Sequence, residues 1–593
     1  MEQKKQSQSL LSGAMLLMLT TTIVHIIGVL YKIPITGVIG EVGRGYFTSA
    51  YEIYTPLYAI SMAGLPVAVS KMVSERMATG KYREVRGVRE ASKRVFLVTG
   101  LVGTTLLLLL AYPFSHYIIK SPNAFYSILA IAPSIFFCCM MSTFRGYYEG
   151  LRNMAPTGIS QVIETVGKLV FGLVLAKLVQ VEGYAQFENT GIVFGTPCVT
   201  ESDAFFAIAP FSAAAAIFGV TLGTVVALIY LFIKHKMHGD GITEAELLSS
   251  PESAPVGSLT KILVRTAVPI ATSSLVLNVT NLIDSVTVQS RLKEAVALDV
   301  GIIRDMYPDI AASGIPDNLI KDFLYGCYGV ALDFRGLIPT VIMTLGVSAI
   351  PVLSAAWATK EREKAESAIH SVIKTATLLA VPAGFCMAVL SKPILQAMYL
   401  STNSTSTITI AAPYVAVFGY FAVLLAISTP ITNMLQAVGR ADVPVKSLLV
   451  GASVKIICNY ILVGNPEINI KGAPIGTVLC YAVIVSHNLY VLLKETGVHL
   501  KWFDCFIRPF FVGALSGGAA YLIYNLGVMY LPMGDMSSRL NGSTVSCVIA
   551  LVFAIIIWLL LLLIFKVMSK SDILMLPKGE KIAKTLEKRG LIR

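Results

Sequence analysis

Charged and polar side chains inside strongly apolar segments are the residues of this chain best suited to do chemistry, because a charge in a bilayer is costly unless it faces a cavity or finds a partner. Gln161, Glu164 and Lys168 occupy one such segment at a spacing of i, i+3 and i+7, which places them on one face of a helix. Glu164 and Lys168 are four residues apart and can pair with each other. The spacing is therefore compatible both with a substrate contact and with a self-neutralised structural pair.

Other candidate binding residues lie in apolar segments of both halves of the chain. His25 and Lys32 are two helical turns apart on one face of the first segment, and Pro34 is expected to break the regular hydrogen bonding of that helix. Lys32 lies near the end of its segment, so extension of its ammonium group to the outer interface is the alternative. The remaining candidates are Glu52, Asp333, Arg335 and Lys455. Because embedded cations come from both halves, a shared cavity would suit an anionic head group such as a phosphate or diphosphate.

Asn281 and Asp284 place a carboxylate beside an amide oxygen in one apolar segment, and such oxygen ligands suit a small hard cation. A cluster of hydrogen bonds between helices is an equally good interpretation of these residues. The nine cysteines include no CxxC pair, and His235 and His238 lie in a charged linker, where solvation is the simpler interpretation. The sequence therefore predicts neither a metal site nor a cofactor.

The composition defines the class of protein that must position these side chains. Hydrophobic residues make up 55% of the 593 positions and charged residues only 14%, against roughly a quarter charged in soluble domains. The apolar residues come in blocks of about twenty or more, the length that crosses a hydrocarbon layer. No aqueous segment is long enough for a soluble catalytic domain, and no GxxxxGK(S/T) phosphate loop occurs. We therefore predict an all-α integral membrane protein that acts as a transporter.

Apolar blocks separated by polar breaks predict about fourteen transmembrane helices. They cover residues 10–38, 45–70, 95–118, 123–145, 156–179, 204–233, 260–290, 322–357, 368–391, 408–434, 443–464, 473–494, 506–531 and 543–567. The basic segments 71–94 and 566–593 lie on the same side only if an even number of helices separates them, and basic segments face the cytoplasm. Both termini of this multi-pass protein are thus predicted to be cytoplasmic. The net charge of +12 then reflects topology and contact with anionic membrane lipids rather than binding of nucleic acid.

The chain repeats itself weakly, as many transporters do. Arg152 and Pro156 follow the fourth predicted helix just as Arg440 and Pro444 follow the tenth, and an embedded lysine comes after each pair. Because six helices return the chain to the side where it began, the two six-helix repeats are parallel and are expected to enclose a central cavity. The predicted domains are an N-lobe at 1–235, a cytoplasmic linker at 236–258, a C-lobe at 259–495, two further helices at 496–570 and a basic cytoplasmic tail at 571–593.

Two motifs give the chain a more specific resemblance. Residues 64–71 read GLPVAVSK, and residues 145–150 read RGYYEG, followed by Asn153, Pro156 and the run SQVIE at 160–164. Both motifs resemble the corresponding segments of the stage V sporulation protein B family. That family belongs to the multidrug/oligosaccharidyl-lipid/polysaccharide (MOP) exporter superfamily, together with the MurJ-type lipid II flippases. The resemblance covers essentially the whole chain and is sharpest toward the N-terminus.

The resemblance implies a two-lobed, V-shaped transporter that moves an undecaprenyl-diphosphate-linked saccharide, such as lipid II, from the inner to the outer leaflet of the bacterial cell membrane. Peptidoglycan synthesis in the spore cortex or the vegetative wall is the implied role, with cell-wall synthases as candidate partners. The implied coupling ion is Na⁺ or H⁺. A sodium site in this group draws on the seventh and eleventh helices, and the matching candidate ligands are Asn281, Asp284 and Asn459.

The implied cavity residues follow the MurJ-type pattern only in part. Those flippases carry cavity arginines on their first, second and eighth helices. Here the first helix offers His25 and Lys32 instead, and the eighth offers Arg335. The second helix has only Arg44, at its outer start. These departures leave the head group of the substrate open.

Two other functions compete with the flippase. A cation-coupled multidrug exporter of the MATE type would need acidic cavity residues for cationic drugs, whereas the embedded charges here are mainly basic. A membrane glycosyltransferase using a polyprenyl-sugar donor would need an acidic motif in a large outer loop. The longest outer loop, 291–321, contains Asp299, Asp305 and Asp309 but no closely paired carboxylates. We therefore expect a transporter without catalytic residues rather than an enzyme.

Overall fold

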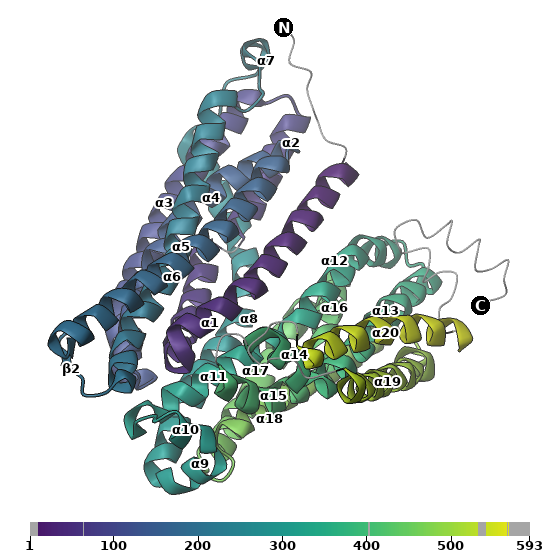
Figure 1. Cartoon of the computed structure of the whole chain (residues 1–593). Helices are drawn as coiled ribbons and strands as arrows, with labels where there is room; N and C mark the ends of the chain where they lie inside the picture. Colours follow the sequence, from purple (N-terminus) through teal and green to yellow (C-terminus); the bar gives the residue numbers. More distant parts are fainter. Residues whose placement is uncertain (1–9, 63, 401–403, 532–540, 566, 568–593) are drawn as a thin grey trace. The chain divides into compact units, whose positions relative to one another are not determined.

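The computed structural model describes residues 10–62, 64–400, 404–531, 541–565 and 567. The helices form two compact units. Unit 1 comprises Met1–Lys293 together with Gly314–Gly326, and unit 2 comprises Glu294–Ser313 together with Cys327–Arg593. Figure 1 colours the chain from purple at the N-terminus to yellow at the C-terminus.

Unit 1 contains the helices of the first half of the chain and one short hairpin. They are α1 (Leu10–Met62), α2 (Leu65–Ala78), α3 (Tyr82–Pro113), the π-helix η1 (Phe114–Ile118), α4 (Ala124–Gly150), α5 (Ala155–Thr190), β1 (Ile192–Val193), β2 (Thr196–Pro197), α6 (Glu201–His238), α7 (Glu244–Ser249) and α8 (Val256–Leu298). The segment Gly314–Gly326 adds the 3₁₀ turn η2 (Asp317–Leu319) and the first turns of α11 (Ile320–Arg335). Within unit 1, α3 packs on α4, and α4 and α5 both pack on α6 (Figure 1).

Unit 2 contains the remaining helices. They are α9 (Val300–Met306), α10 (Pro308–Ala312), the rest of α11, α12 (Leu337–Ala358), α13 (Arg362–Val389), α14 (Ser391–Tyr399), α15 (Thr405–Tyr420), α16 (Ala422–Ala437), α17 (Asp442–Cys458), the π-helix η4 (Asn459–Val463), the 3₁₀ turn η5 (Asn469–Lys471), α18 (Gly472–Thr496), the π-helix η6 (Phe503–Ile507), α19 (Arg508–Tyr530) and α20 (Gly542–Ile564). Buried aliphatic side chains of α12, α13, α16 and α18 form its main core. The last two helices pack on each other, and α19 rests on α13 through Gly513 and Gly517.

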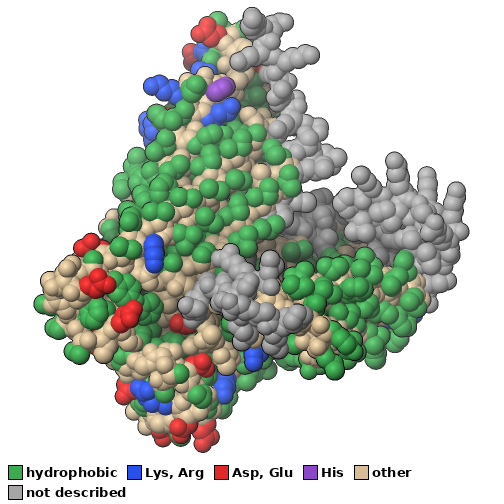
Figure 2. Space-filling view, viewed as in Figure 1, with side chains coloured by type: hydrophobic (Ala, Val, Ile, Leu, Met, Phe, Trp, Pro, Cys, Tyr) green, Lys and Arg blue, Asp and Glu red, His purple; other side chains and the backbone are tan. Residues whose placement is uncertain are grey.

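The helices have the length and composition of membrane spans. Nine spans among the described residues are long and apolar enough to cross a membrane, and the bent pair of α15 and α16 would make a tenth. Figure 2 shows apolar side chains covering the exposed flank of unit 1, with charged side chains gathered toward its ends. Each of the fourteen predicted spans falls on helix. The all-α, multi-pass membrane class is therefore confirmed, while the number fourteen stays a prediction.

The first two predicted spans form one bent helix. Pro34, which is predicted to break the regular hydrogen bonding, lies within α1; the helix continues through it and is interrupted at Gly40. Gly40 has φ 68° and ψ 177°, a conformation that favours glycine. A Cβ at this position would lie 2.5 Å from Cζ of Phe205, so the bend also lets α6 approach α1 closely. The proline is tolerated because neighbouring helices can compensate for the missing backbone donor.

The predicted linker at 236–258 has structure of its own. α6 extends through His238, and α7 begins with a capping box in which Thr243 Oγ1 accepts from the Glu246 backbone N–H at 3.3 Å. Residues 259–293 of α8 pack in unit 1, although the repeat places them in the C-lobe. The packing of the helices and the sequence repeat thus divide the chain at different positions. The domain limits derived from the repeat stay a prediction.

A seam of small residues joins α5 to α6. The glycine seam consists of Gly167, Gly172, Gly219 and Gly223. A Cβ on Gly223 would lie 2.6 Å from the Glu164 carbonyl oxygen and 2.7 Å from the backbone nitrogen of Lys168. Such close backbone approach between helices is typical of membrane proteins, where van der Waals packing and hydrogen bonding replace the hydrophobic effect. The seam therefore holds α6 directly against the charged stretch of α5.

Candidate functional site

Three charged side chains from α4 and α5 meet inside unit 1. Glu164 Oε1 lies 2.6 Å from Nζ of Lys168, one turn further along α5, and Glu164 Oε2 lies 3.0 Å from Nη2 of Arg145 in α4. Arg145 Nε also donates a hydrogen bond to Ser160 Oγ at 2.9 Å. The side chains of Glu164, Arg145 and Lys168 are 12%, 13% and 26% exposed. We call these three residues the ionic cluster.

The two sequence motifs form the packing that aims Arg145 at Glu164. Gly64 adopts φ 79° immediately before α2, and Pro66 occupies the first turn of that helix. Gly146 lies so close to α2 that a Cβ would be 2.8 Å from the Pro66 carbonyl oxygen. Gly150 approaches Val73 in the same way, and its carbonyl accepts a hydrogen bond from Ser74 Oγ at 2.9 Å. Because α2 occupies the glycine face of α4, the neighbouring Arg145 points toward α5 instead.

The charges of the ionic cluster do not cancel. Two cations share one carboxylate in an apolar surrounding that includes buried side chains of Cys138, Met141 and Leu231. Removing a charge from water is expensive, and the partner charge together with good hydrogen bonds offsets that cost. The guanidinium and ammonium groups retain donors that one carboxylate does not use. The cluster could therefore bind an additional anion, and a phosphate or diphosphate matches this donor set.

The structure brings together only part of the predicted site. Glu164 and Lys168 are in direct contact, and Gln161 is half-buried on the same helix with its Oε1 unpartnered among the described residues. Lys32 and Glu52 are half-buried residues of α1. The side chain of His25 lies outside the described residues.

The other predicted residues divide between the two units. Asn281 and Asp284 belong to α8 in unit 1, and Asp284 is buried. Unit 2 holds Asp333, Arg335, Lys455 and Asn459; the first two are half-buried near the end of α11, and the last two are buried. The shared cavity and the sodium site therefore stay predictions. Among the described residues, no group of three His, Cys, Asp or Glu side chains is arranged to hold a metal ion.

Sequence reasoning missed two embedded arginines. Arg145 was part of a recognised motif and was the last residue of its predicted span, whereas α4 continues through Gly150 and carries Arg145 into the packed interior. Arg44 was placed at the outer start of a span, yet it is only 2% exposed, with its guanidinium carbon 5.2 Å from the ring centroid of Phe47. The signal for Arg145 was its position 15 residues before Ser160 and 19 residues before Glu164, across a short turn that ends at Pro156.

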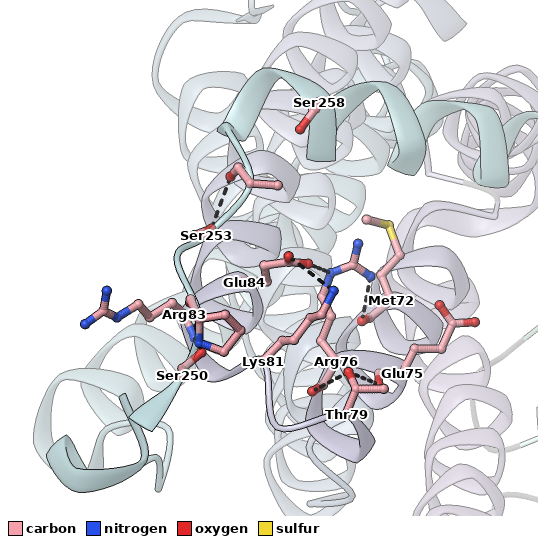
Figure 3. A network of polar contacts seen from close by, with 12 residues as sticks. Met72, Glu75, Arg76, Thr79, Lys81, Arg83, Glu84, Ser250, Ser253 and Ser258 are labelled. Carbon is pink, nitrogen blue, oxygen red and sulfur yellow. Dashed lines mark hydrogen bonds and ion pairs between the residues drawn. The ribbon is translucent and has the colours of Figure 1, made fainter. Parts of the chain in front are cut away.

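The basic segment after α2 has defined partners. Arg83, Arg86 and Arg89 follow one another at three-residue intervals on α3, and we call them the basic stripe. Arg83 Nε donates to the Leu247 carbonyl at 2.9 Å. Its backbone N–H donates to Ser250 Oγ at 3.1 Å, and both residues are drawn in Figure 3. Figure 3 also shows Arg76 bridging from α2 to Glu84 of α3, at 2.9 Å.

The other two arginines of the basic stripe hold the start of the linker. Arg86 binds both carboxylate oxygens of Asp240, at 3.0 and 3.3 Å, and Arg89 contacts the ring of His235. Tyr147 of the RGYYEG motif donates to the same carboxylate at 3.1 Å. The basic stripe thus ties the linker to α3 and α4, in addition to any contact it makes with lipid.

Substituting Asn for Asp240 is expected to loosen the linker at neutral pH. Burial alone would raise the pKa of Asp240, but hydrogen bonds from Arg86, Ile242 and Tyr147 bring the pKa below its ordinary value. The ionised carboxylate therefore stabilises the folded linker above the ordinary pKa of aspartate, and this contribution is lost as the pH falls through the lowered pKa. Limited proteolysis of the linker should be about two- to fivefold faster in the variant.

The pH dependence separates this effect from a general loss of stability. The difference in cleavage rate between Asp240→Asn and the unchanged protein should shrink on acidification toward the pKa of Asp240. Tyr147→Phe is the matched control, because it removes one hydrogen bond and leaves the charge pair in place. Equal cleavage rates at neutral pH would show that Asp240 does not hold the linker.

Comparison with known proteins agrees with the fold and the motifs. The family model described as polysaccharide biosynthesis protein matches residues 10–190, and the MatE model matches residues 326–461. Stage V sporulation protein B of Bacillus subtilis (strain 168) is 22% identical over 577 residues, which cover 96% of this chain and 98% of that protein. Lipid II flippase MurJ of the same organism is 25% identical over 512 residues, 84% of each chain.

Two solved structures share the fold. Lipid II flippase MurJ in an inward closed conformation has a TM-score of 0.56 at 14% identity, covering 93% of this chain and 98% of that one. An inward-facing MATE family transporter has a TM-score of 0.55 at 15% identity, covering 79% and 98%. Fold and matches together define a multi-pass membrane protein with the fold of MurJ and MATE transporters. Along its sequence the chain is similar to stage V sporulation protein B and to MurJ, so the resemblance drawn from the motifs is confirmed.

Proposed function

We propose that this protein is a flippase that moves an undecaprenyl-diphosphate-linked saccharide, with a peptidoglycan precursor such as lipid II as the first candidate, from the inner to the outer leaflet. The observation that carries the proposal is the ionic cluster, in which Arg145 and Lys168 share the single carboxylate of Glu164 inside an apolar helix bundle. A diphosphate is the chemical group that this donor set fits. The similarity to a lipid II flippase over 84% of both chains supports the same substrate class.

Electrostatics favours the proposed direction of transport. With the cytoplasm negative, moving an anionic head group outward gains about 2.3 kcal/mol per charge for each 100 mV. Coupling to Na⁺ or H⁺ is also part of the proposal, with Asn281, Asp284 and Asn459 as the candidate cation ligands. The proposed location is the bacterial cell membrane with both termini in the cytoplasm, and the proposed partners are the lipid-linked substrate, anionic lipids and cell-wall synthases.

The decisive experiment measures where lipid-linked precursors accumulate. The protein is depleted in a strain that lacks other flippases, and the precursors in each leaflet are labelled and identified by mass. We expect them to be trapped on the cytoplasmic side, which also identifies the saccharide. An unchanged leaflet distribution would contradict the flippase.

A multidrug exporter of the MATE type is the second candidate, because the MatE model matches residues 326–461. This alternative predicts normal precursor distribution after depletion and increased sensitivity to cationic dyes. The embedded cations favour an anionic substrate instead. The relatives with a stated activity are a flippase and multidrug transporters, in line with a transporter rather than an enzyme.

Lys32→Ala and Arg335→Ala test the predicted cavity beyond the ionic cluster. Each variant is expected to lose precursor flipping while its amount in the membrane stays unchanged, because both residues are half-buried cations, Lys32 within α1 and Arg335 at the end of α11. Lys177→Ala is a suitable control, since Lys177 is exposed and, within the part of the chain that the structure describes, bonds Gln180 on its own helix. Full flipping activity in both variants would show that neither Lys32 nor Arg335 belongs to the substrate site.

A further inference from the structure

A histidine near the end of α6 belongs to a chain of hydrogen bonds that leads into the linker. His235 Nε2 contacts the guanidinium group of Arg89, which is part of the basic stripe on α3. On the other side of the ring, Nδ1 lies 3.1 Å from the hydroxyl of Tyr148 in α4, and that hydroxyl donates to the Gly239 carbonyl at 3.1 Å. The chain therefore joins α3, α6, α4 and the first residues of the linker.

The direction of each hydrogen bond in this chain follows from Arg89. A guanidinium group is always protonated in proteins and cannot accept a hydrogen bond, so His235 Nε2 must supply the lone pair. The neutral ring then carries its proton on Nδ1 and donates it to the Tyr148 oxygen, which leaves the Tyr148 proton for the Gly239 carbonyl. Only a neutral His235 can thus make all of these contacts at once.

The charges around His235 oppose a second proton on the ring. Arg86 and Arg89 of α3 and Asp240 of the linker interact with the ring electrostatically. Asp240 would favour a charged ring, but its carboxylate is already bound by Arg86 through two hydrogen bonds and by a tyrosine hydroxyl of α4. The side chains that lie around the ring on α4, and the charged neighbours of His235 on α6, are Phe144, Tyr147 and Tyr148, and Lys234 and Lys236. Protonation would therefore place a positive ring against Arg89 and break that contact.

The linker leaves α6 through a turn with room to change conformation. Gly239 and Gly241 flank Asp240 with φ 62° and φ 76°, and a Cβ at either glycine would have no atom within 4 Å. From Gly239 to Ser249, all of which the structure describes, Ile242 is the one buried residue. Release of this stretch therefore exposes little apolar surface, and polar contacts decide whether it is held.

We propose that His235 is a pH sensor, which fastens the linker to α3 and α4 while its ring is neutral and releases the linker when the ring takes up a proton. The proposal concerns contacts within unit 1 and does not rest on the proposed transport function. With the linker on the cytoplasmic side, as the basic segments predict, the proton comes from the cytoplasm.

The sign and size of the response follow from linkage. In the released linker His235 has the ordinary pKa of histidine, about 6.5, whereas the fastened form has no acceptor left for the proton. The ratio of fastened to released linker is then nearly constant above about pH 7.5 and falls about tenfold between pH 7.5 and pH 5.5. Asp240 does not contribute over this range, because its pKa lies below its ordinary value and it stays ionised.

Hydrogen–deuterium exchange of the purified full-length protein measures this release. Exchange is followed in peptides that cover residues 239–250 and is expressed as protection factors, so that the intrinsic pH dependence of exchange cancels. We expect the protection factors to fall about tenfold from pH 7.5 to pH 5.5. In His235→Gln they should stay at the neutral-pH value, because the amide oxygen still accepts from Arg89 and cannot be protonated. His238→Gln is the matched control: His238 is exposed on the same helix, and this variant should keep the full acid response.

Arg89→Gln separates the sensor from a linker that merely weakens in acid. Without the guanidinium group nothing prevents a proton on His235, so protection should be lower at neutral pH and change by less than about twofold on acidification. Equal protection of the unchanged protein at both pH values, or an undiminished acid response in His235→Gln, would overturn the proposal. A parallel fall in peptides from the middle of α4 would show general unfolding and would equally overturn it.

Discussion

Replacing Glu164 by Ala is expected to be among the most damaging single changes in unit 1. The variant leaves Arg145 and Lys168 as two like charges in an apolar interior, with no carboxylate to offset them. Removing one partner of a buried ion pair typically lowers the free energy of unfolding by about 3–5 kcal/mol. We expect the amount of protein in the membrane to fall accordingly, as measured by quantitative immunoblotting after extraction and by thermal aggregation in detergent.

Two further variants separate stability from transport. Glu182→Ala removes an exposed glutamate from the same helix and should change the free energy of unfolding by less than about 0.5 kcal/mol. Lys168→Met added to Glu164→Ala should recover much of the lost protein, because one unpaired charge is then removed. The recovered double variant should still fail to flip precursors, since only Arg145 remains to bind the diphosphate. If the Glu164→Ala variant is present in the membrane in the same amount as the unchanged protein, the ionic cluster must be solvated.

Substituting Ala for Gly219 should separate α5 from α6. The added Cβ would overlap the backbone of Gly172, which cannot move aside as a flexible side chain could. Overpacking of this kind costs about 1–3 kcal/mol or more. In this seam it also displaces the α5 backbone that carries the ionic cluster. We expect roughly tenfold less protein in the membrane and loss of flipping in what remains.

Gly28→Ala is the matched control for Gly219→Ala. Gly28 is also helical and in unit 1, but a Cβ there has no atom within 4 Å. This variant should keep normal abundance or gain slightly, because alanine favours helix over glycine by roughly 1 kcal/mol. Normal abundance of Gly219→Ala would show that the seam opens at little cost.

Hydropathy alone located the helices but not their breaks. Blocks of about twenty apolar residues must be helical in lipid, since every backbone group has to be bonded internally. Breaks depend on tertiary neighbours instead: α1 bends at Gly40 beside Phe205 rather than at Pro34, and the predicted span 322–357 is divided at Gly336 into α11 and α12. The residues packed around a proline decide whether the helix continues through it, and the sequence pattern alone does not show which residues these are.

The sequence predicted the contact of the candidate site that lies within one helix, but it did not predict the contact between two helices. Glu164 and Lys168 are one helical turn apart, so their pairing follows from spacing. Their third partner, Arg145, comes from another helix, and only the packing of Gly146 against Pro66 determines its direction. Lys321 looked like an exposed loop residue and is buried, because its hydrogen bonds go to backbone carbonyls 202 residues away in the chain.

The basic stripe also bears on how the protein is made. Arg86 leaves the ribosome 154 residues before its partner Asp240, and four membrane helices must be synthesised in between. At 5–20 residues per second this interval lasts roughly 10–30 s. Throughout that time we expect anionic lipid head groups to supply the counter-charge for the arginines. With the basic stripe on the cytoplasmic side, as we predict, these arginines would pass from lipid to protein, and closure of the Arg86–Asp240 pair would mark the completion of the first six predicted spans.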